Sequence, residues 1–117
     1  MQQSLSVVLE RNTRLSGEFT TEPYEVAWAR EARWFIRVLE MEGAGTRLDA
    51  TTQISPDGLH WCDLEDGRAS ISERGLVSWP AREFGGWLRL KGTVTSDSGE
   101  SDDAASARVL IYLALKS

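Results

Sequence analysis

The sequence contains few of the residues from which most enzyme active sites and metal centres are built. It has one histidine, His60, and one cysteine, Cys62, among 117 residues. A structural zinc site needs four ligands, and a cysteine nucleophile needs a base in contact with it and a third group to orient that base. Two residues apart on a strand, His60 and Cys62 share a face but are too distant for a good hydrogen bond. We therefore expect that the protein is not an enzyme and that it has no catalytic residues, no metal and no cofactor.

Long apolar runs and clustered positive charge are also missing. No run approaches the ~18 residues of a membrane span, and residues 1–4 lack the basic and apolar parts of a signal peptide. The chain has only two lysines, scattered arginines and a net charge of −5, whereas a nucleic-acid surface needs clustered cations. We expect a protein made in the cytoplasm, compatible with incorporation into a particle, that binds neither nucleic acid nor membranes. The single thiol fits a reducing compartment, and we expect it to be buried.

The dominant pattern is alternation of apolar and polar residues with period two, which is typical of strands. Residues 25–42 contain good helix formers, but their apolar positions trace no helical stripe and their Val, Trp, Phe and Ile favour a strand. About eight strands are predicted, at 4–9, 24–29, 34–41, 47–54, 69–72, 76–79, 87–91 and 108–116, with a short extended piece at 19–21. Many short strands with Gly-rich turns predict an all-β, antiparallel, jelly-roll-like β-sandwich that forms a single domain over residues 1–117.

Two of the predicted strands are apolar on both faces. Residues 34–41 and 108–116 carry large apolar side chains at successive positions, which places them in the middle of a sheet or an assembly. A sandwich of this size has a limited interior. Part of this apolar surface is therefore expected between subunits, in a homo-oligomer or a larger assembly.

The negative charge is concentrated in one segment. Thr95 to Asp103 contains four acids and no base, and without those acids the net charge would be −1. Carboxylates and hydroxyls suit Ca²⁺, but the spacing of an EF-hand is absent. We expect an acidic, flexible loop at residues 95–106; calcium binding is the alternative role of its acids, Asp97, Glu100, Asp102 and Asp103.

Five tryptophans are many for a chain of this length. Trp28 and Trp34 lie on strands predicted to be internal. Trp79 precedes a proline in a stretch that resembles a loop, and Trp87 follows two glycines. Trp79 and Trp87 are therefore the candidate exposed contact residues, because indole rings are common at interfaces and on sugar-binding platforms. Their candidate polar neighbours are Arg82 and Glu83.

The segment Ser55-Pro56-Asp57-Gly58 predicts a tight turn, since proline presets φ and glycine accepts positive φ. Leu59 and Trp61 then continue into the next strand, which makes a hairpin. This S-x-D-G-x-x-W pattern, followed later by Gly86-Trp87-Leu88-Arg89-Leu90, resembles galactose-binding-like (discoidin-type) jelly-roll modules over less than a third of the chain. Similar hairpins occur in accessory proteins of phage particles. The resemblance implies the fold and assigns no binding residue.

Two functions follow as hypotheses. The first is a non-catalytic structural module that self-associates or docks on a larger particle, such as a virion or a tail; its partner is then itself or another protein of the assembly. The second is a carbohydrate-binding module whose partner is a glycan held by exposed tryptophans. The two hypotheses differ in the oligomeric state and in the response of tryptophan fluorescence to glycans.

Overall fold

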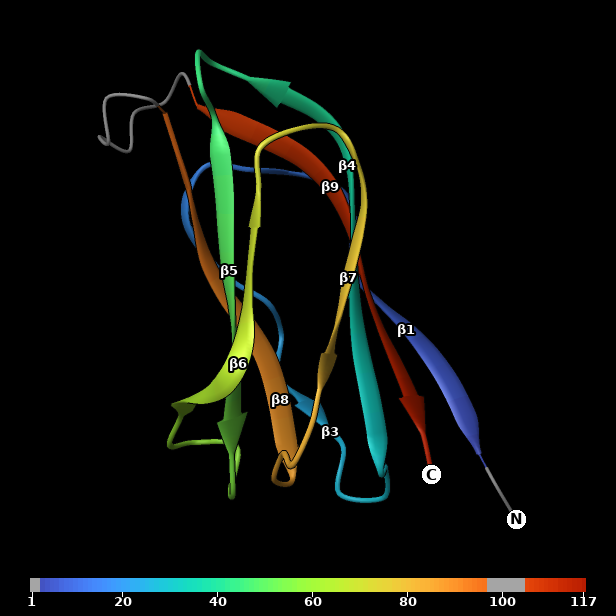
Figure 1. Ribbon diagram of the computed structural model, residues 1–117. Coiled ribbons are helices and arrows are strands. Elements are labelled where there is room, and N and C mark those ends of the chain that lie inside the picture. Colours follow the sequence, from blue (N-terminus) through green and yellow to red (C-terminus); the bar gives the residue numbers. More distant parts are fainter. Residues whose placement is uncertain (1–2, 97–104) are drawn as a thin grey trace.

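The computed structural model describes residues 3–96 and 105–117 as two β-sheets packed face to face (Figure 1). Within these residues there is no helix that could cross a membrane. Every pairing between strands is antiparallel. The strands are β1 (Ser4–Leu15), β2 (Gly17–Thr20), β3 (Tyr24–Glu25), β4 (Glu31–Glu42), β5 (Arg47–Ser55), β6 (Cys62–Ile71), β7 (Gly75–Ala81), β8 (Trp87–Thr95) and β9 (Ser106–Lys116).

The strand order is that of a jelly roll. One sheet has the order β1-β9-β4-β7, and the other has the order β2-β8-β5-β6 with β3 also paired to β8. The short strands β2 and β3 lie on the same side of β8, where β2 pairs with residues 91–94 and β3 with residues 87–88. Nine strand segments therefore occupy eight positions, four in each layer, as expected for this fold. The predicted all-β sandwich is confirmed.

The core lies between the inner faces of the two sheets and follows the alternation of each strand. The two strands predicted to be apolar on both faces, β4 and β9, are the inner strands of the four-stranded sheet. Their inward side chains are completely or almost completely buried, and side chains of β5 and β8 meet them from the other sheet. The largest fully buried side chains include Trp34, Ile36, Leu48, Leu88, Leu90, Ile111, Leu113 and Leu115.

The strand predicted over residues 24–29 is wrong beyond Glu25. Backbone pairing stops after the Val26 N–H, which donates to the Gly86 carbonyl at 2.7 Å, and Ala29 N–H then bonds back to Val26 at 2.9 Å. Trp28 therefore lies half-buried in a turn rather than on an internal strand. The hairpin strand after the tight turn also begins later than predicted, at the first residue of β6.

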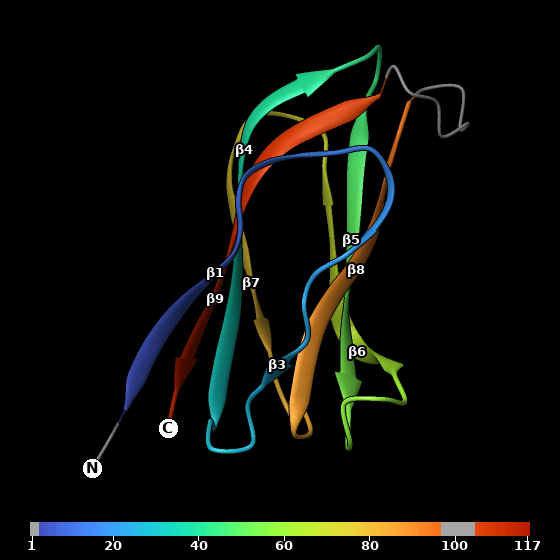
Figure 2. The same cartoon turned by 180° about the vertical axis from the view of Figure 1, so that it is seen from behind.

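The two ends of the described chain lie side by side. The Ser117 N–H donates to the Gln3 carbonyl at 2.9 Å, and the Gln3 N–H donates to Ser117 Oγ at 2.7 Å. Both views show the start of β1 beside the end of β9, at the end of the sandwich opposite the end of β8 and the start of β9 (Figures 1 and 2). The first and last strands are therefore neighbours in one sheet, although they are furthest apart in sequence.

Candidate interaction surface

Trp79, which the sequence suggests as an exposed contact residue, lies in the core. Its side chain is 7 % exposed, and its Nε1 donates a hydrogen bond to Thr52 Oγ1 of the other sheet at 3.2 Å. Residues 75–81 form an edge strand, where Pro80 is tolerated, rather than a loop. Alternation along this strand turns Trp79 inward, directly opposite Trp34. The expected exposure of Trp79 is therefore wrong.

Trp87 is half-buried at the start of β8, on the outer face of the five-stranded sheet. Its ring lies against the backbone of Gly58, where an added Cβ would come within 3.0 Å of Trp87 Cε2. Trp79 and Trp87 belong to different sheets, and Trp79 faces inward. The two indoles therefore do not form a common platform.

Arg82 and Glu83 are exposed and directly follow β7. Glu83 has a positive φ of 55°, so the chain turns sharply here on its way to β8. Both residues line a groove formed with β4 and β9. They lie at one end of the four-stranded sheet, whereas Trp87 lies on the other sheet, and their role in binding stays a prediction.

The predicted tight turn is held by side-chain hydrogen bonds. The buried Ser55 Oγ accepts the N–H groups of Asp57 and Gly58 at 3.2 and 2.8 Å. Asp57 Oδ1 accepts the N–H groups of Leu59 and His60 at 2.8 and 2.9 Å, and Asp57 Oδ2 lies 2.7 Å from His60 Nδ1. The bonds from the His60 backbone and ring, then from the Leu59 backbone, hold the pKa of Asp57 far below its usual value. The S-x-D-G motif therefore acts here as a structural element of the hairpin.

Cys62 is exposed at the first position of β6, so the expected burial of the thiol is wrong. The side chain of His60, 84 % exposed, lies in the turn before the strand. His60 and Cys62 therefore do not share a strand face as the sequence suggested. Among residues 3–96 and 105–117, no group of three or more His, Cys, Asp or Glu residues is arranged to hold a metal ion.

One polar cluster on the five-stranded sheet was not predicted. The Arg89 guanidinium carbon lies 4.2 Å from the centre of the Trp61 ring, in a cation–π contact. Arg89 Nε donates to Gln53 Oε1 at 2.8 Å, and Gln53 Nε2 donates to Asp63 Oδ1 at 3.0 Å. Alternation places Gln53 on the outer face, but the contact with Arg89 depends on the register between β5 and β8, which the sequence does not reveal.

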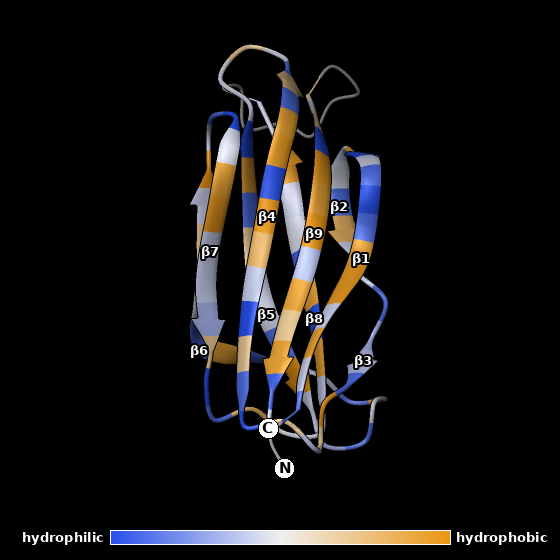
Figure 3. Cartoon of the chain, turned by 90° about the vertical axis from the view of Figure 1, so that its right-hand side faces the viewer, coloured by the Kyte–Doolittle hydropathy of each residue, from blue (hydrophilic) through white to orange (hydrophobic). Residues whose placement is uncertain are grey.

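Apolar residues occur along all four strands of the four-stranded sheet (Figure 3), and alternation turns part of them to its outer face. Phe35 of β4 is directly opposite Tyr112 of β9, and Tyr112 is directly opposite Val8 of β1. Leu76 of β7, 63 % exposed, and Val8, 37 % exposed, are among the most exposed large apolar residues. We call this set, with the half-buried Leu110, the apolar face; its members are Val8, Phe35, Leu76, Leu110 and Tyr112.

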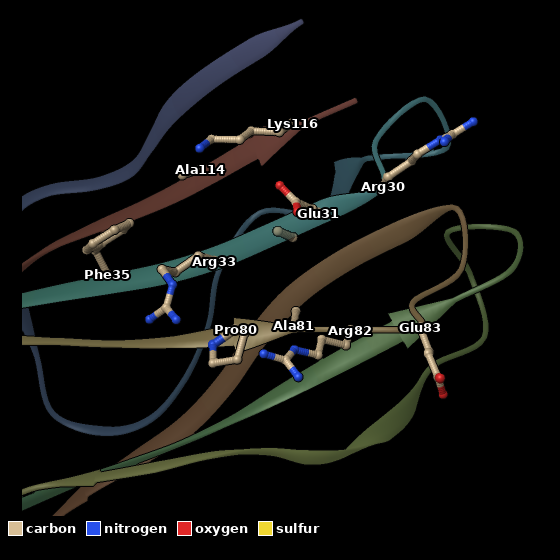
Figure 4. A pocket seen from close by; sticks show the side chains of 11 residues that line it. Arg30, Glu31, Arg33, Phe35, Pro80, Ala81, Arg82, Glu83, Ala114 and Lys116 are labelled. Atoms are coloured by element: carbon tan, nitrogen blue, oxygen red, sulfur yellow. The ribbon is translucent and has the colours of Figure 1, made fainter. Parts of the chain in front are cut away.

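A groove of about 660 Å³ crosses one end of the same sheet (Figure 4). Its apolar wall is formed by Phe35 and Pro80. Four cationic and two acidic side chains surround them, namely Arg30, Arg33, Arg82, Lys116, Glu31 and Glu83. In the close view Arg33 and Arg82 extend on either side of Pro80, whereas Glu83 points away.

The acids of the predicted acidic loop fall outside the described residues. They are Asp97, Glu100, Asp102 and Asp103, and the calcium alternative rests on the same four positions. The strands on either side of them are described: β8 ends at Thr95 and β9 begins at Ser106.

Comparison with known proteins finds similarity in the fold of this chain but not in its sequence. No protein family and no curated protein matches its sequence. The PBSX exported protein XepA has a TM-score of 0.67 and 8 % identity over 95 % of this chain, which spans 36 % of XepA. The SPBc2 prophage-derived protein YomS has a TM-score of 0.60 and 10 % identity, over 100 % of this chain and 96 % of YomS. A chain of infectious bursal disease virus, Gx strain, has a TM-score of 0.53 and 13 % identity, over 100 % of this chain and 32 % of its own. This protein therefore shares its β-sandwich fold with these three proteins.

Proposed function

We propose that this protein is a non-catalytic structural module that self-associates or docks on a larger particle, such as a virion or a tail. The observation that carries this proposal is the apolar face. Phe35 and Tyr112 form an aromatic cross-strand pair on the outside of the sheet, and Val8 and Leu76 extend it to both edge strands. Fully burying one such side chain contributes roughly 1.5–3 kcal/mol. Covering this face would therefore be favourable.

The opposite face of the sandwich supports this choice of surface. Apart from Trp87, the outward positions of β5 and β8 beyond the Trp61 cluster are occupied by polar residues, including Asp49, Thr51, Lys91 and Thr93. A face that is polar in this way is typical of a solvated sheet. The two outer faces therefore differ, and the apolar face is the one suited to a protein partner.

The comparisons support the type of assembly. The match to prophage-derived YomS extends over nearly the full length of both chains, and the same fold occurs in a chain of a virus structure. At these identities the similarity concerns the fold, so a particle-associated role for this chain is our inference.

Light scattering across a concentration series tests the proposal. We expect the wild type to form an oligomer at micromolar concentration and the double variant Phe35→Ser/Tyr112→Ser to be monomeric. The matched control, Lys91→Ser/Thr93→Ser, changes two outward residues of the polar face and should associate like the wild type. A wild type that stays monomeric at all concentrations would refute self-association, and an oligomer indifferent to the first variant would refute the assigned surface.

Glycan binding is the second candidate, and the Trp61 cluster favours it. An indole ring beside Arg89, Gln53 and Asp63 combines a stacking surface with hydrogen-bonding groups, which are the elements of a sugar site. This site replaces the platform expected at Trp79 and Trp87. Tryptophan fluorescence should then respond to a member of a glycan panel in the wild type and not in Trp61→Ala; no response from the wild type would exclude this candidate.

A further inference from the structure

The groove beside the apolar face has an excess of cations that the described residues leave without ion-pair partners. Arg30, Arg33, Arg82 and Lys116 line it, and none of them makes a salt bridge within residues 3–96 and 105–117. Arg33 donates only to the hydroxyl of Ser78, at 2.8 Å. Elsewhere on this sheet's outer face, among the described residues, Arg14 and Arg108 are paired with Glu40 or Glu42, whereas Arg37 of β4 also makes no salt bridge. The groove is therefore the end of the face that can accept negative charge.

The chain itself contains a segment of complementary charge. Residues 97–103 hold four acids and no base, in a protein whose remaining residues have a net charge of −1. Glu31 and Glu83 offset part of the positive charge of the groove, which leaves four cations against two acids. A short acidic peptide strand would thus meet an excess of guanidinium and ammonium groups, which bind carboxylates with charge-assisted hydrogen bonds.

The groove and the two strand ends that flank the acidic segment, Thr95 of β8 and Ser106 of β9, lie at opposite ends of the sandwich. β4 pairs with β9 from Glu31↔Lys116, beside the groove, to Glu42↔Ser106, beside the segment. The 12 residues of β4 separate these ends by about 36 Å at ~3.3 Å per residue. A connection from Thr95 to Ser106 extends at most about 20 Å from its anchors, since an extended chain spans at most ~3.6 Å per residue. The far end of the groove, at Glu31 and Lys116, therefore lies beyond the reach of the segment of the same molecule.

We propose that this groove binds the acidic segment of residues 97–103 of a second copy of the protein. This inference rests on the proposed function and names a second contact between the copies, next to the apolar face. The contact joins unlike surfaces, so it is head-to-tail, and repeating it produces a ring or a filament. Exposed ion pairs are individually weak and are screened by salt. Several pairs acting together are therefore required, and the contact weakens as salt increases.

A peptide binding experiment tests the groove directly. A fluorescent peptide of residues 95–106 is titrated with the full chain, and a matched peptide carries Asn or Gln at its four acidic positions. We expect saturable binding of the acidic peptide, at least roughly tenfold weaker in the double variant Arg33→Glu/Arg82→Glu and unchanged in a single control, Arg68→Glu, on the other sheet. Equal binding of both peptides, or no binding, would overturn the proposal.

A charge exchange in the full chain tests the contact between copies. Arg33→Glu/Arg82→Glu and Asp102→Lys/Asp103→Lys should each reduce association measured by light scattering, and a chain that carries all four changes should regain it. Thermal unfolding confirms that each variant is folded. Variants that associate as the wild type does would overturn the inference.

The failure of this inference is distinguishable from the failure of the proposed function. Association that disappears in Phe35→Ser/Tyr112→Ser but is indifferent to salt and to the charge variants keeps the module role and overturns the groove contact. Saturable peptide binding in a chain that remains monomeric supports the groove as an acidic-peptide site and overturns self-association. A monomer that binds no peptide overturns both.

Discussion

A hydrogen bond between the two sheets gives a prediction that can be worked out in numbers. Trp79 of β7 donates to Thr52 of β5 at 3.2 Å, at the side of the sandwich where β7 and β6 are the edge strands of the two sheets. Thr52→Val keeps the shape of the side chain but leaves the indole N–H without its acceptor. Trp79→Phe removes the donor and some volume. The double variant removes both partners, so no unsatisfied donor remains.

The expected costs follow from burial. A buried donor left unsatisfied costs about 1–3 kcal/mol, and we expect about 1.5 kcal/mol for Thr52→Val because Trp79 is 7 % exposed and water relieves part of the penalty. Trp79→Phe should cost about 2 kcal/mol, mostly through lost packing. The double variant should cost about 2.5 kcal/mol, less than the two single changes together by about 1 kcal/mol. For 117 residues, 1 kcal/mol corresponds to about 4 °C in Tm.

Urea and thermal unfolding of the four proteins measure this cycle. Trp34→Phe is the control, because Trp34 Nε1 is buried without a hydrogen-bond partner among the described residues and its removal costs volume but no hydrogen bond. Additive costs for Thr52→Val and Trp79→Phe, or a free energy of unfolding that is unchanged in Thr52→Val, would refute the reasoning and show that the contact contributes nothing to stability.

Three further predictions concern other sites. Gly92→Ala should destabilise the fold by about 2–3 kcal/mol in urea unfolding, because the added Cβ would lie 2.2 Å from the Asp49 carbonyl oxygen. A smaller cost would mean that β5 and β8 separate easily at this point. The pKa of Asp57 is lowered from 3.8, so its charge stabilises the native state above that pH, and this stabilisation is lost as the pH falls below it. The Tm advantage of the wild type over Asp57→Asn should therefore shrink on acidification below about pH 4, and an advantage independent of pH would contradict this. Cys62 is exposed and should react with a thiol reagent in the native protein as fast as in urea; slow native reaction would contradict its exposure.

The sheet pattern was largely predictable from the sequence. Alternation identifies the strands, and apolar residues on both faces correctly place residues 34–41 and 108–116 inside a sheet. Alternation fails where the chain stops pairing and turns. Residues 26–29 continue the pattern of a strand, yet Val26 follows the last paired residue and the backbone turns back on itself. Local pattern does not show where pairing ends.

The candidate site was less predictable because it depends on contacts distant in sequence. The Trp79-Pro80 pair resembles a loop, and only the pairing of β7 with β4 reveals an edge strand with the indole inside. The groove combines residues of β4, β7 and β9, and the Trp61 cluster combines residues of β5, β6 and β8. The registers between these strands are set by the whole sandwich. Cys62 was expected to be buried from its residue type, but it stands where the hairpin returns to the sheet and its side chain meets solvent.

The position of β9 has a consequence for synthesis on the ribosome. This strand lies between β1 and β4 in its sheet, although it is the last of the described strands to be translated, about 90 residues after the end of β1. Until β9 emerges, β1 has no neighbour and β4 has one free edge, and free edges are templates for aggregation. The nascent chain therefore cannot complete this sheet before β9 has been made, and a product truncated before residue 106 would lack the middle of that sheet rather than its margin.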